Sequence, residues 1–250
     1  MSEALKSDYR RALETGAQSL NAALSGTDAI GALNRCLVDI YPGESCVVSS
    51  FGAESAVILH MVAVTAPDSP VFFINTEKLF DETVDYRDRL VERLGLTNIQ
   101  TLTPSVHDLK ADDPDGTLHQ RNTDMCCYIR KTLPLVRALR PYKVWISGRK
   151  RHHGGSRSEL PRVEIQDGKL KLNPLYDWDS ARLHDYMRSH ELPYHPLVAQ
   201  GYPSIGCIPC TARVTDPNAD PRSGRWAGSE KTECGIHIGA DGKIVRSGSS

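Results

Sequence analysis

The chain has 250 residues, and its 30 lysines and arginines nearly balance 31 aspartates and glutamates. This is the composition of a globular protein, so collagen-like and disordered classes are excluded, and a formal net charge of -1 argues against a dedicated nucleic-acid binder. The unusual feature is the number of cysteines, seven, which is odd.

Residues 1–14 (MSEALKSDYRRALE) predict a short polar amphipathic helix, with acidic residues and no apolar run. Such a segment is unlike a secretory leader, and no stretch of the chain reaches the ~18 apolar residues that span a bilayer. We therefore expect a cytoplasmic protein with no membrane segment, in a reducing compartment where structural disulfides are rare. The cysteines then serve core packing, metal ligation or redox chemistry.

Short apolar segments alternate with helical patterns over the first 150 residues. Residues 124–139 predict a helix that Pro134 disturbs, and residues 103–120, with two prolines and several aspartates, are expected to form a mobile loop. The remaining elements are strands at 46–51, 71–75, 99–102 and 143–147 and helices at 53–64 and 81–94. This alternation predicts an α/β fold with a doubly wound, mostly parallel sheet.

The pattern changes after the fourth strand. Residues 163–172 predict a β-hairpin with Asp167-Gly168 as its turn, and residues 179–190 a helix capped by Asp179 or Ser180. From residue 193 the chain is rich in proline, glycine and charge, and we expect an irregular segment that folds over the sheet. We therefore divide the chain into an N-terminal helical region (1–40), an α/β nucleotide-binding domain (41–192) and a C-terminal segment (193–250).

Two loops that follow predicted strands are candidates for binding an anion. In the turn Ser50-Phe51-Gly52, small residues leave backbone N–H groups free to meet an anion at a helix N-terminus, although an ordinary strand–helix turn has the same composition. The turn lacks the Gly-Lys-Ser/Thr ending of a Walker A loop. The second loop, 148–157, carries basic residues from Arg149 to His153 and then Arg157, at the sheet edge where open α/β folds bind ligands. It is either a site for a nucleotide-like anion or a solvated basic loop.

Four of the cysteines form a pattern that is typical of a metal centre. Cys126 and Cys127 are adjacent at a predicted helix start, and Cys207 and Cys210 form a C-x-x-C motif. Four thiolates can hold a zinc ion or an iron–sulfur cluster, C-x-x-C alone can be a redox pair, and the four thiols can also be unrelated. Adjacent helical residues diverge by about 100°, which favours a wide [4Fe–4S] cluster over a single zinc ion unless the helix end is distorted. Cys36 and Cys46 lie in apolar patterns and are expected in the core.

The seventh cysteine lies near the C-terminus. Cys234 stands in Glu-Cys-Gly-Ile-His, with His237 three residues further on. Nearby basic side chains favour a thiolate, so Cys234 is a candidate nucleophile on a tail that can reach a site. The alternative is a surface cysteine with no role.

Together and in this order, these features resemble the assimilatory sulfonucleotide reductases, the adenylyl-sulfate and phosphoadenylyl-sulfate reductases. The resemblance extends from about Cys46 to His237. It rests on Ser-Ser-Phe-Gly, Asn75-Thr-Glu, Phe80-Asp-Glu-Thr, Cys126-Cys127, the loop 148–157, Tyr194-His-Pro-Leu, Cys207-Ile-Pro-Cys210 and Glu233-Cys-Gly-Ile-His237.

The resemblance implies a fold and a reaction. The fold is that of the ATP-pyrophosphatase-like (adenine nucleotide α-hydrolase-like) proteins. The reaction is the thioredoxin-dependent reduction of adenylyl sulfate to sulfite and AMP, in sulfate assimilation and cysteine biosynthesis, through an S-sulfocysteine on Cys234. Family members with the four matching cysteines carry a [4Fe–4S] cluster and mostly use adenylyl sulfate. The cluster-free members lack these cysteines and use the 3′-phosphorylated form. A homo-oligomer is also expected, with no nucleic-acid or membrane partner.

The resemblance also implies individual roles. Lys131 matches a lysine between cluster and substrate, Arg157 matches the arginine of the basic loop, and His237 matches the tail histidine. Other substrate-binding positions are Ser50, Phe51, Gly52, Arg222 and Arg225. The chain departs from the family at Asn75, where aspartate is usual, and at His152-His153, where the loop is usually Arg-Arg-x-Gln-Ser.

Two other functions compete with this one. A true ATP pyrophosphatase of the same fold needs a Ser-Gly-Gly-x-Asp-Ser loop, and residues 50–55 of this chain are Ser-Phe-Gly-Ala-Glu-Ser. A zinc-stabilised binding module, without catalysis, would use the same four cysteines as a Cys₄ site.

Overall fold

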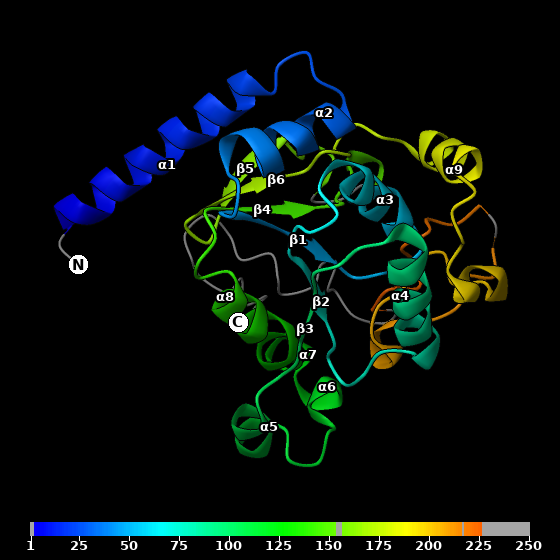
Figure 1. Cartoon of the computed structure of the whole chain (residues 1–250). Helices are drawn as coiled ribbons and strands as arrows, with labels where there is room; N and C mark the ends of the chain where they lie inside the picture. The colour runs from blue at the N-terminus through cyan, green and yellow to red at the C-terminus, as the bar shows by residue number, and fades with distance from the viewer. Residues whose placement is uncertain (1–2, 154–156, 217, 227–250) are drawn as a thin grey trace.

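A single six-stranded sheet organises the computed structural model, which describes residues 3–153, 157–216 and 218–226. The strand order is β3-β2-β1-β4-β6-β5, and every neighbouring pair is parallel except β5 with β6 (Figure 1). The strands are β1 (Ser45–Ser49), β2 (Val71–Ile74), β3 (Ile99–Leu102), β4 (Val144–Ser147), β5 (Val163–Gln166) and β6 (Lys169–Leu172). The prediction of a doubly wound, mostly parallel sheet is confirmed.

Helices connect these strands and cover the sheet. They are α1 (Glu3–Ala23), α2 (Ala29–Asn34), α3 (Ser55–Thr65), α4 (Asp81–Leu94), α5 (Val106–Asp112), α6 (Leu118–Arg121), α7 (Thr123–Cys127), α8 (Leu133–Ala138) and α9 (Ser180–Ser189). Two π-helical turns, Arg35–Ile40 and Tyr128–Thr132, and three 3₁₀ turns, Arg151–His153, Pro196–Gln200 and Ile208–Cys210, complete the described elements. None of the described helices is long and apolar enough to cross a membrane.

The sheet separates two cores, because successive strand residues point to opposite faces. On one face, Val47 of β1 and Phe73 of β2 pack with α3, whose side chains are apolar almost all round and which is buried for that reason. On the other face, Cys46 and Trp145 pack against Leu135 of α8. The result is three layers, with α3 and α4 on one side of the sheet and α8 on the other (Figure 1).

The N-terminal helix is longer than its sequence pattern predicts. Leu20 and Leu24, near the end of α1, belong to the main core, and the Tyr9 hydroxyl donates a hydrogen bond of 2.7 Å to the Gly168 carbonyl. The helix therefore lies along β5 and β6 at the sheet edge, and its first turns extend beyond the sheet (Figure 1). Most of the helix surface is exposed and polar, so the narrow apolar stripe that packs against the core is hard to recognise in the sequence.

Several local predictions are confirmed by backbone geometry. The hairpin turn has Asp167 at φ 53° and Gly168 at φ 69°, the left-handed pair that a two-residue turn requires. Helix α4 ends at Gly95, also left-handed, and the Asp179 carboxylate accepts the Arg182 N–H to cap α9.

One prediction needs correction, and a second gains detail. Residues 103–120 are not a structureless loop, because they contain α5 and the start of α6, each with its own side-chain acceptor for a backbone N–H, Ser105 and Asp113. The helix expected over 124–139 is divided into α7, a π-helical turn and α8. Pro134 lacks the N–H that a regular α-helix needs there, so the irregularity expected at this proline is a π turn just before it.

Candidate functional site

A cavity lined by basic residues lies at the point in the sheet where the order of the strands reverses. From β1 the chain passes through α3 to β2, whereas β4, on the other side of β1, is reached through α8 on the opposite face. Such a switch point leaves a crevice at the carboxyl ends of the two strands. Here a cavity of about 290 Å³ is lined by the loops that follow β1 and β4.

The turn after β1 forms the floor of this cavity. Ser50 and Gly52 line it, and the Oγ atoms of Ser49 and Ser55 accept the backbone N–H groups of Phe51 and Gly52 at 3.2 and 2.9 Å. Phe51 has a φ of 49°, uncommon for a residue with a side chain, and its ring is buried edge-on against Phe73 at 5.3 Å. The Phe51 side chain therefore anchors the turn in the core, and the cavity lining does not include it.

The loop after β4 supplies most of the positive charge. Arg149, Lys150, both histidines and Arg157 line the cavity. Arg151 is turned away, because its guanidinium lies over the Tyr176 ring and donates to the Leu160 carbonyl. Arg157 is buried, with 8% of its surface exposed. Guanidinium and ammonium groups concentrated around one cavity are typical of a phosphate- or sulfate-binding site.

The irregular C-terminal segment, which the sequence predicted to fold over the sheet, forms another wall of the cavity. Arg222, Arg225 and Trp226 line the cavity together with residues 203–206. The Arg225 guanidinium donates to the Ile205 and Cys210 carbonyls at 3.1 and 3.2 Å. A Cβ at Gly206 would collide with that guanidinium, so a larger residue at this position would displace Arg225. Sequence reasoning missed Trp226 and Gly206, because no regular element marks this segment.

A second, much smaller cavity of about 10 Å³ is lined by the four cysteines of the predicted metal centre, Cys126, Cys127, Cys207 and Cys210. Cys126, Cys127 and Cys207 are buried, Cys210 is half-buried, and none of the four forms a disulfide. Burial, followed by the neighbouring Cys127, raises the pKa of the Cys126 thiol to about 11. The structure thus brings together all four predicted ligands from two distant segments. Lys131 lines both this cavity and the basic one.

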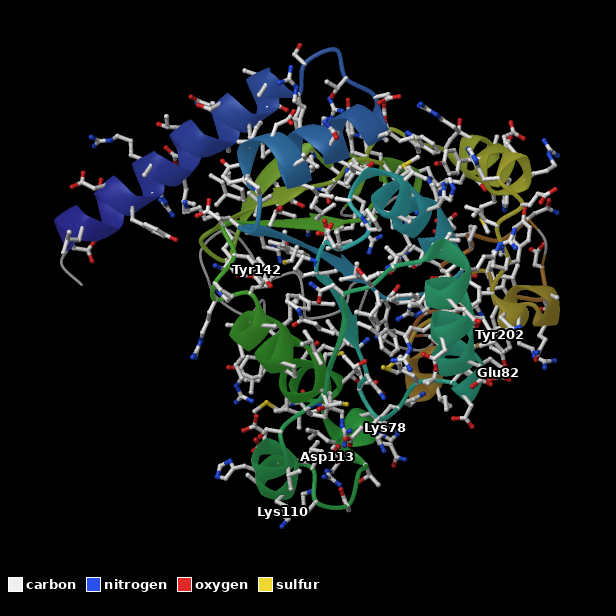
Figure 2. All side chains as sticks on the ribbon, viewed as in Figure 1. Lys78, Glu82, Lys110, Asp113, Tyr142 and Tyr202 are labelled. Carbon is white, nitrogen blue, oxygen red and sulfur yellow. The ribbon has the colours of Figure 1, made fainter. Side chains whose placement is uncertain are left out.

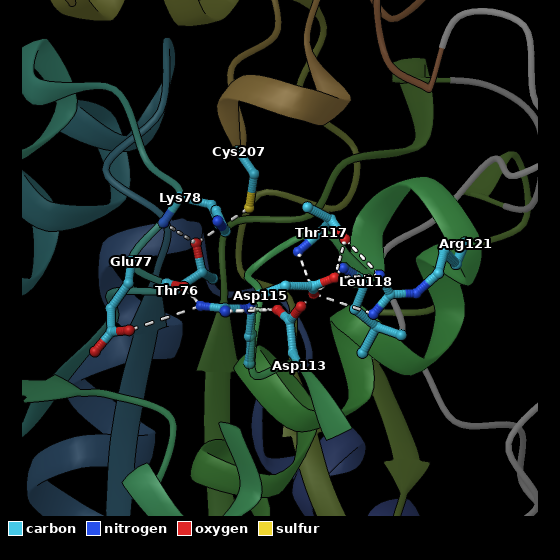
Figure 3. A network of polar contacts seen from close by, with 10 residues as sticks. Thr76, Glu77, Lys78, Asp113, Asp115, Thr117, Leu118, Arg121 and Cys207 are labelled. Atoms are coloured by element: carbon cyan, nitrogen blue, oxygen red, sulfur yellow. Dashed lines mark hydrogen bonds and ion pairs between the residues drawn. The ribbon is translucent and has the colours of Figure 1, made fainter. Parts of the chain in front are cut away.

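A buried ion pair holds the surroundings of the thiols in place. The Asp113 carboxylate accepts from Arg130 Nη2 at 2.6 Å and Nε at 3.0 Å, and Arg130 Nη1 donates to the Thr76 carbonyl at 2.8 Å. The Thr76 hydroxyl lies 3.2 Å from Cys207 Sγ, as Figure 3 shows. Lys78 lies near Asp113 at the base of the segment that carries α5 (Figure 2). Burial alone would raise the pKa of Asp113, but the Leu118 N–H and then Arg130 hold it below its usual value.

The tandem pair Cys126-Cys127 ends α7, and the π-helical turn Tyr128–Thr132 follows directly. The helix is therefore distorted beside the thiols, which was one of the two ways in which adjacent cysteines could face one group. The same turn carries Arg130 and Lys131 inward, and both are buried. π turns within helices are frequent at functional sites.

The remaining residues singled out in the sequence are two core cysteines, two residues of the C-terminal tail, and Asn75. Cys36 and Cys46 are fully buried in the two cores, as expected, and burial raises the pKa of both thiols. Cys234 and His237 lie outside the described residues. Asn75, where the family usually has aspartate, accepts the Glu77 N–H at 2.9 Å, which is a turn contact that either side chain can make.

Fold and site together define a doubly wound α/β protein with a basic cavity at its switch point and a four-thiol site beside it. The family model of the phosphoadenosine phosphosulfate reductase domain matches residues 44–213, and the chain belongs to this family.

Individual relatives extend this result over more of the chain. An adenosine 5′-phosphosulfate reductase of Mesorhizobium japonicum is 47% identical over 222 residues, 89% of this chain and 87% of its own length. A phosphoadenosine 5′-phosphosulfate reductase of Gloeobacter violaceus is 42% identical over 208 residues, 81% of this chain and 84% of its own. The crystal structure of phosphoadenylyl-sulfate reductase from Candida auris in its phosphate complex superposes with a TM-score of 0.65 at 26% identity, over 79% of this chain and 96% of that one.

Proposed function

We propose that this protein reduces adenylyl sulfate to sulfite and AMP in assimilatory sulfate reduction, with thioredoxin as the electron donor. The observation that carries the proposal is the pair of adjoining cavities, one basic and one lined by four thiols, with Lys131 in the wall of both. The two relatives and the solved structure described above, all three named as sulfonucleotide reductases, support the same reaction class.

The charge of the larger cavity supports an anionic substrate. Lys150, Arg157 and Arg225 approach it from two different segments. The turn at Ser50 and Gly52 also lines it, but serine hydroxyls accept the N–H groups of Phe51 and Gly52, so the positive charge comes from the side chains. Adenylyl sulfate carries a phosphate joined to a sulfate, and such a mixed anhydride needs several cations to hold it and to stabilise the leaving phosphate. The 3′-phosphorylated substrate is the alternative, and the name of the Gloeobacter relative favours keeping it in the test.

We propose that Cys126, Cys127, Cys207 and Cys210 hold a [4Fe–4S] cluster. Thiolates are the ligands such a cluster takes, and four converge here on one cavity. A single zinc ion, with Zn–S bonds of ~2.3 Å, would hold sulfur atoms roughly 3.8 Å apart. Within the described part of the chain, the group of three ligand atoms that lie within 4.8 Å of one another belongs to Glu54, His152 and His153, and no three of the thiol sulfurs are that close together. The sulfurs are therefore spread more widely than a single zinc ion would hold them, which favours the cluster. The cluster would supply structural and electrostatic support beside Lys131.

The proposed chemistry uses the tail cysteine. The Cys234 thiolate attacks the sulfate sulfur, the bond from sulfur to the phosphate oxygen breaks, and AMP leaves with the electron pair. One thioredoxin thiolate then attacks the Cys234 sulfur of the resulting S-sulfocysteine, and sulfite departs. The second thioredoxin thiol resolves the mixed disulfide, so two electrons pass from the dithiol to sulfur. His237, also in the tail, and Arg222, in the cavity wall, are proposed to bind the substrate.

The test is sulfite release by the purified protein with thioredoxin, comparing adenylyl sulfate with its 3′-phosphorylated form under anaerobic conditions. Faster release from adenylyl sulfate supports the proposal, and no sulfite from either substrate overturns it. Iron content decides the cofactor: a brown protein with about four irons per chain supports the cluster. A colourless protein with one zinc would make the binding module the better function.

Three further expectations accompany this function. We propose a cytoplasmic location, where a reducing medium keeps the thiols free, and assembly into a homo-oligomer. The division into regions 1–40, 41–192 and 193–250 also remains a prediction.

A further inference from the structure

Two adjacent histidines at the edge of the basic cavity depart from the family pattern. His152 and His153 end the 3₁₀ turn after β4, and Glu54, at the start of α3, lies against both. One ligand atom from each of these three residues falls within 4.8 Å of the other two. Two histidines and a carboxylate are a common metal-binding set, so the hydrogen bonds around them decide what the group does.

The contacts of His153 oppose metal binding. Its Nδ1 lies 3.1 Å from Arg157 Nη1, and a guanidinium can only donate, so Nδ1 is the acceptor. In a neutral imidazole the proton must then be on Nε2, which donates to Glu54 Oε2 at 3.0 Å. Burial lowers the pKa of His153 to about 4, which is consistent with the neutral form. An Nε2 atom that carries a proton offers no lone pair to a metal ion.

The carboxylate is also satisfied by a charged partner. Lys150 Nζ lies 2.7 Å from the same Oε2 atom of Glu54, and the Lys150 side chain is 4% exposed. Burial alone would raise the pKa of Glu54, but Lys150 and then the two histidines hold it well below its usual value. A metal cation would have to displace this ammonium group within a cavity that is already strongly positive.

His152 has the opposite arrangement. Its Nδ1 lies 2.9 Å from the Trp178 carbonyl, an acceptor, so Nδ1 carries the proton. Its Nε2 faces Glu54 Oε1 at 3.7 Å, and Glu54 raises the pKa of His152. The two neighbouring imidazoles therefore serve different purposes, and His153 alone connects Glu54 to Arg157.

We propose that Glu54 and His153 are positioning residues for Arg157. The chain of hydrogen bonds from carboxylate to imidazole to guanidinium fixes the His153 tautomer and aims Arg157 along the cavity wall. Arginine has many rotamers, and a guanidinium that is already oriented loses less entropy when it binds an anion. This inference rests on the proposed function only for the identity of the anion, because any nucleotide phosphate in the cavity would meet Arg157 in the same way.

The test compares three single variants and one double variant by the affinity for AMP, measured calorimetrically, and by KM and kcat for adenylyl sulfate. His153→Leu removes both hydrogen bonds at similar volume, whereas His153→Gln keeps one acceptor and one donor. Arg157→Ala is combined with His153→Leu in a double-mutant cycle. We expect His153→Leu to weaken AMP binding roughly tenfold, the usual effect of losing one hydrogen bond to a charged group, and to raise KM more than it lowers kcat. His153→Gln should restore most of the affinity.

The cycle gives the decisive result. If His153 acts through Arg157, His153→Leu has little further effect once Arg157 is alanine. The inference would be overturned if the losses of AMP affinity in the two single variants were additive, or if His153→Gln bound AMP as weakly as His153→Leu. It would also be overturned if the protein bound one zinc ion per chain in the absence of nucleotide and Glu54→Gln abolished that binding. If the AMP affinities show the expected coupling between His153 and Arg157 but the protein releases no sulfite, the proposed function is refuted and this inference stands.

Discussion

The ion pair between Asp113 and Arg130 gives the sharpest stability prediction. The Asp113 side chain is fully buried, that of Arg130 is 5% exposed, and their closest atoms are 2.6 Å apart. Asp113→Asn keeps the shape and retains an oxygen for the Leu118 N–H, but it leaves the buried Arg130 charge with only the half-exposed Glu77 carboxylate, 3.7 Å away, as its counter-ion. Breaking one side of a buried pair costs about 3–5 kcal/mol, and the retained hydrogen bond places the expected loss near ~3 kcal/mol. For a chain of this length, that lowers Tm by roughly 6–12 °C.

A matched control lies two residues away. Asp115 pairs with Arg121 at the same distance, 2.6 Å, but its side chain is 53% exposed. Water screens such a pair, so Asp115→Asn should leave stability close to that of the unmodified protein. The two pairs have the same closest distance and differ strongly in burial, so the comparison tests whether burial makes the pair matter for stability.

The assay is urea unfolding under anaerobic conditions, read as a shift of the midpoint at constant slope. Because the folded-state pKa of Asp113 is lowered, its contribution is present above the unfolded pKa, ~3.9, and is lost as pH falls through the folded value. Unmodified protein and Asp113→Asn should therefore differ at pH 7 and converge in acid. Equal midpoints for Asp113→Asn and Asp115→Asn at pH 7 would refute the reasoning.

Three predictions concern the site. Lys131→Ala should lower turnover at least tenfold, because Lys131 lies in the wall of both cavities and its positive charge would be lost beside the substrate. Iron per chain should stay near normal, because the lysine is not a ligand of the cluster. Iron loss matching that of Cys207→Ala would contradict this. Gly206→Ala should raise KM several-fold, since its Cβ displaces the Arg225 guanidinium, and an unchanged KM would show that Arg225 does not contact substrate. Cys234→Ser should abolish sulfite release but keep AMP affinity and iron, and substantial turnover in this variant would exclude the cysteine as nucleophile.

The sequence predicted what depends on neighbours along the chain. The strands, the Asp167-Gly168 turn and the end of α4 at Gly95 follow from periodicity and backbone preference, which are local properties. The segment 103–120 was misjudged because short helices such as α5 have little periodicity and are held by caps and by the contact of Asp113 with Arg130.

The site was predictable at the level of motifs and not of contacts. The loops after β1 and β4 could be assigned to one cavity, because parallel strands place their carboxyl ends at one edge. The contact between Glu54 and His153 joins residues 99 positions apart, and it exists only because β1 and β4 are neighbours in the sheet. Phe51 illustrates the same limit: its neighbours Ser50 and Gly52 line the cavity, but only the packing against Phe73 shows that the Phe51 ring faces the core.

The walls of the basic cavity come from distant parts of the chain, from the turn after β1 and from the last described residues, up to Trp226. A nascent chain therefore has no binding site until its last described segment has docked. Contacts between such distant parts of a chain form late and slowly during folding. Nucleotide bound in this cavity would tie the first strand to the last turn, and by mass action it would stabilise the whole domain rather than one loop. A bound ligand would thereby become part of what keeps the protein folded.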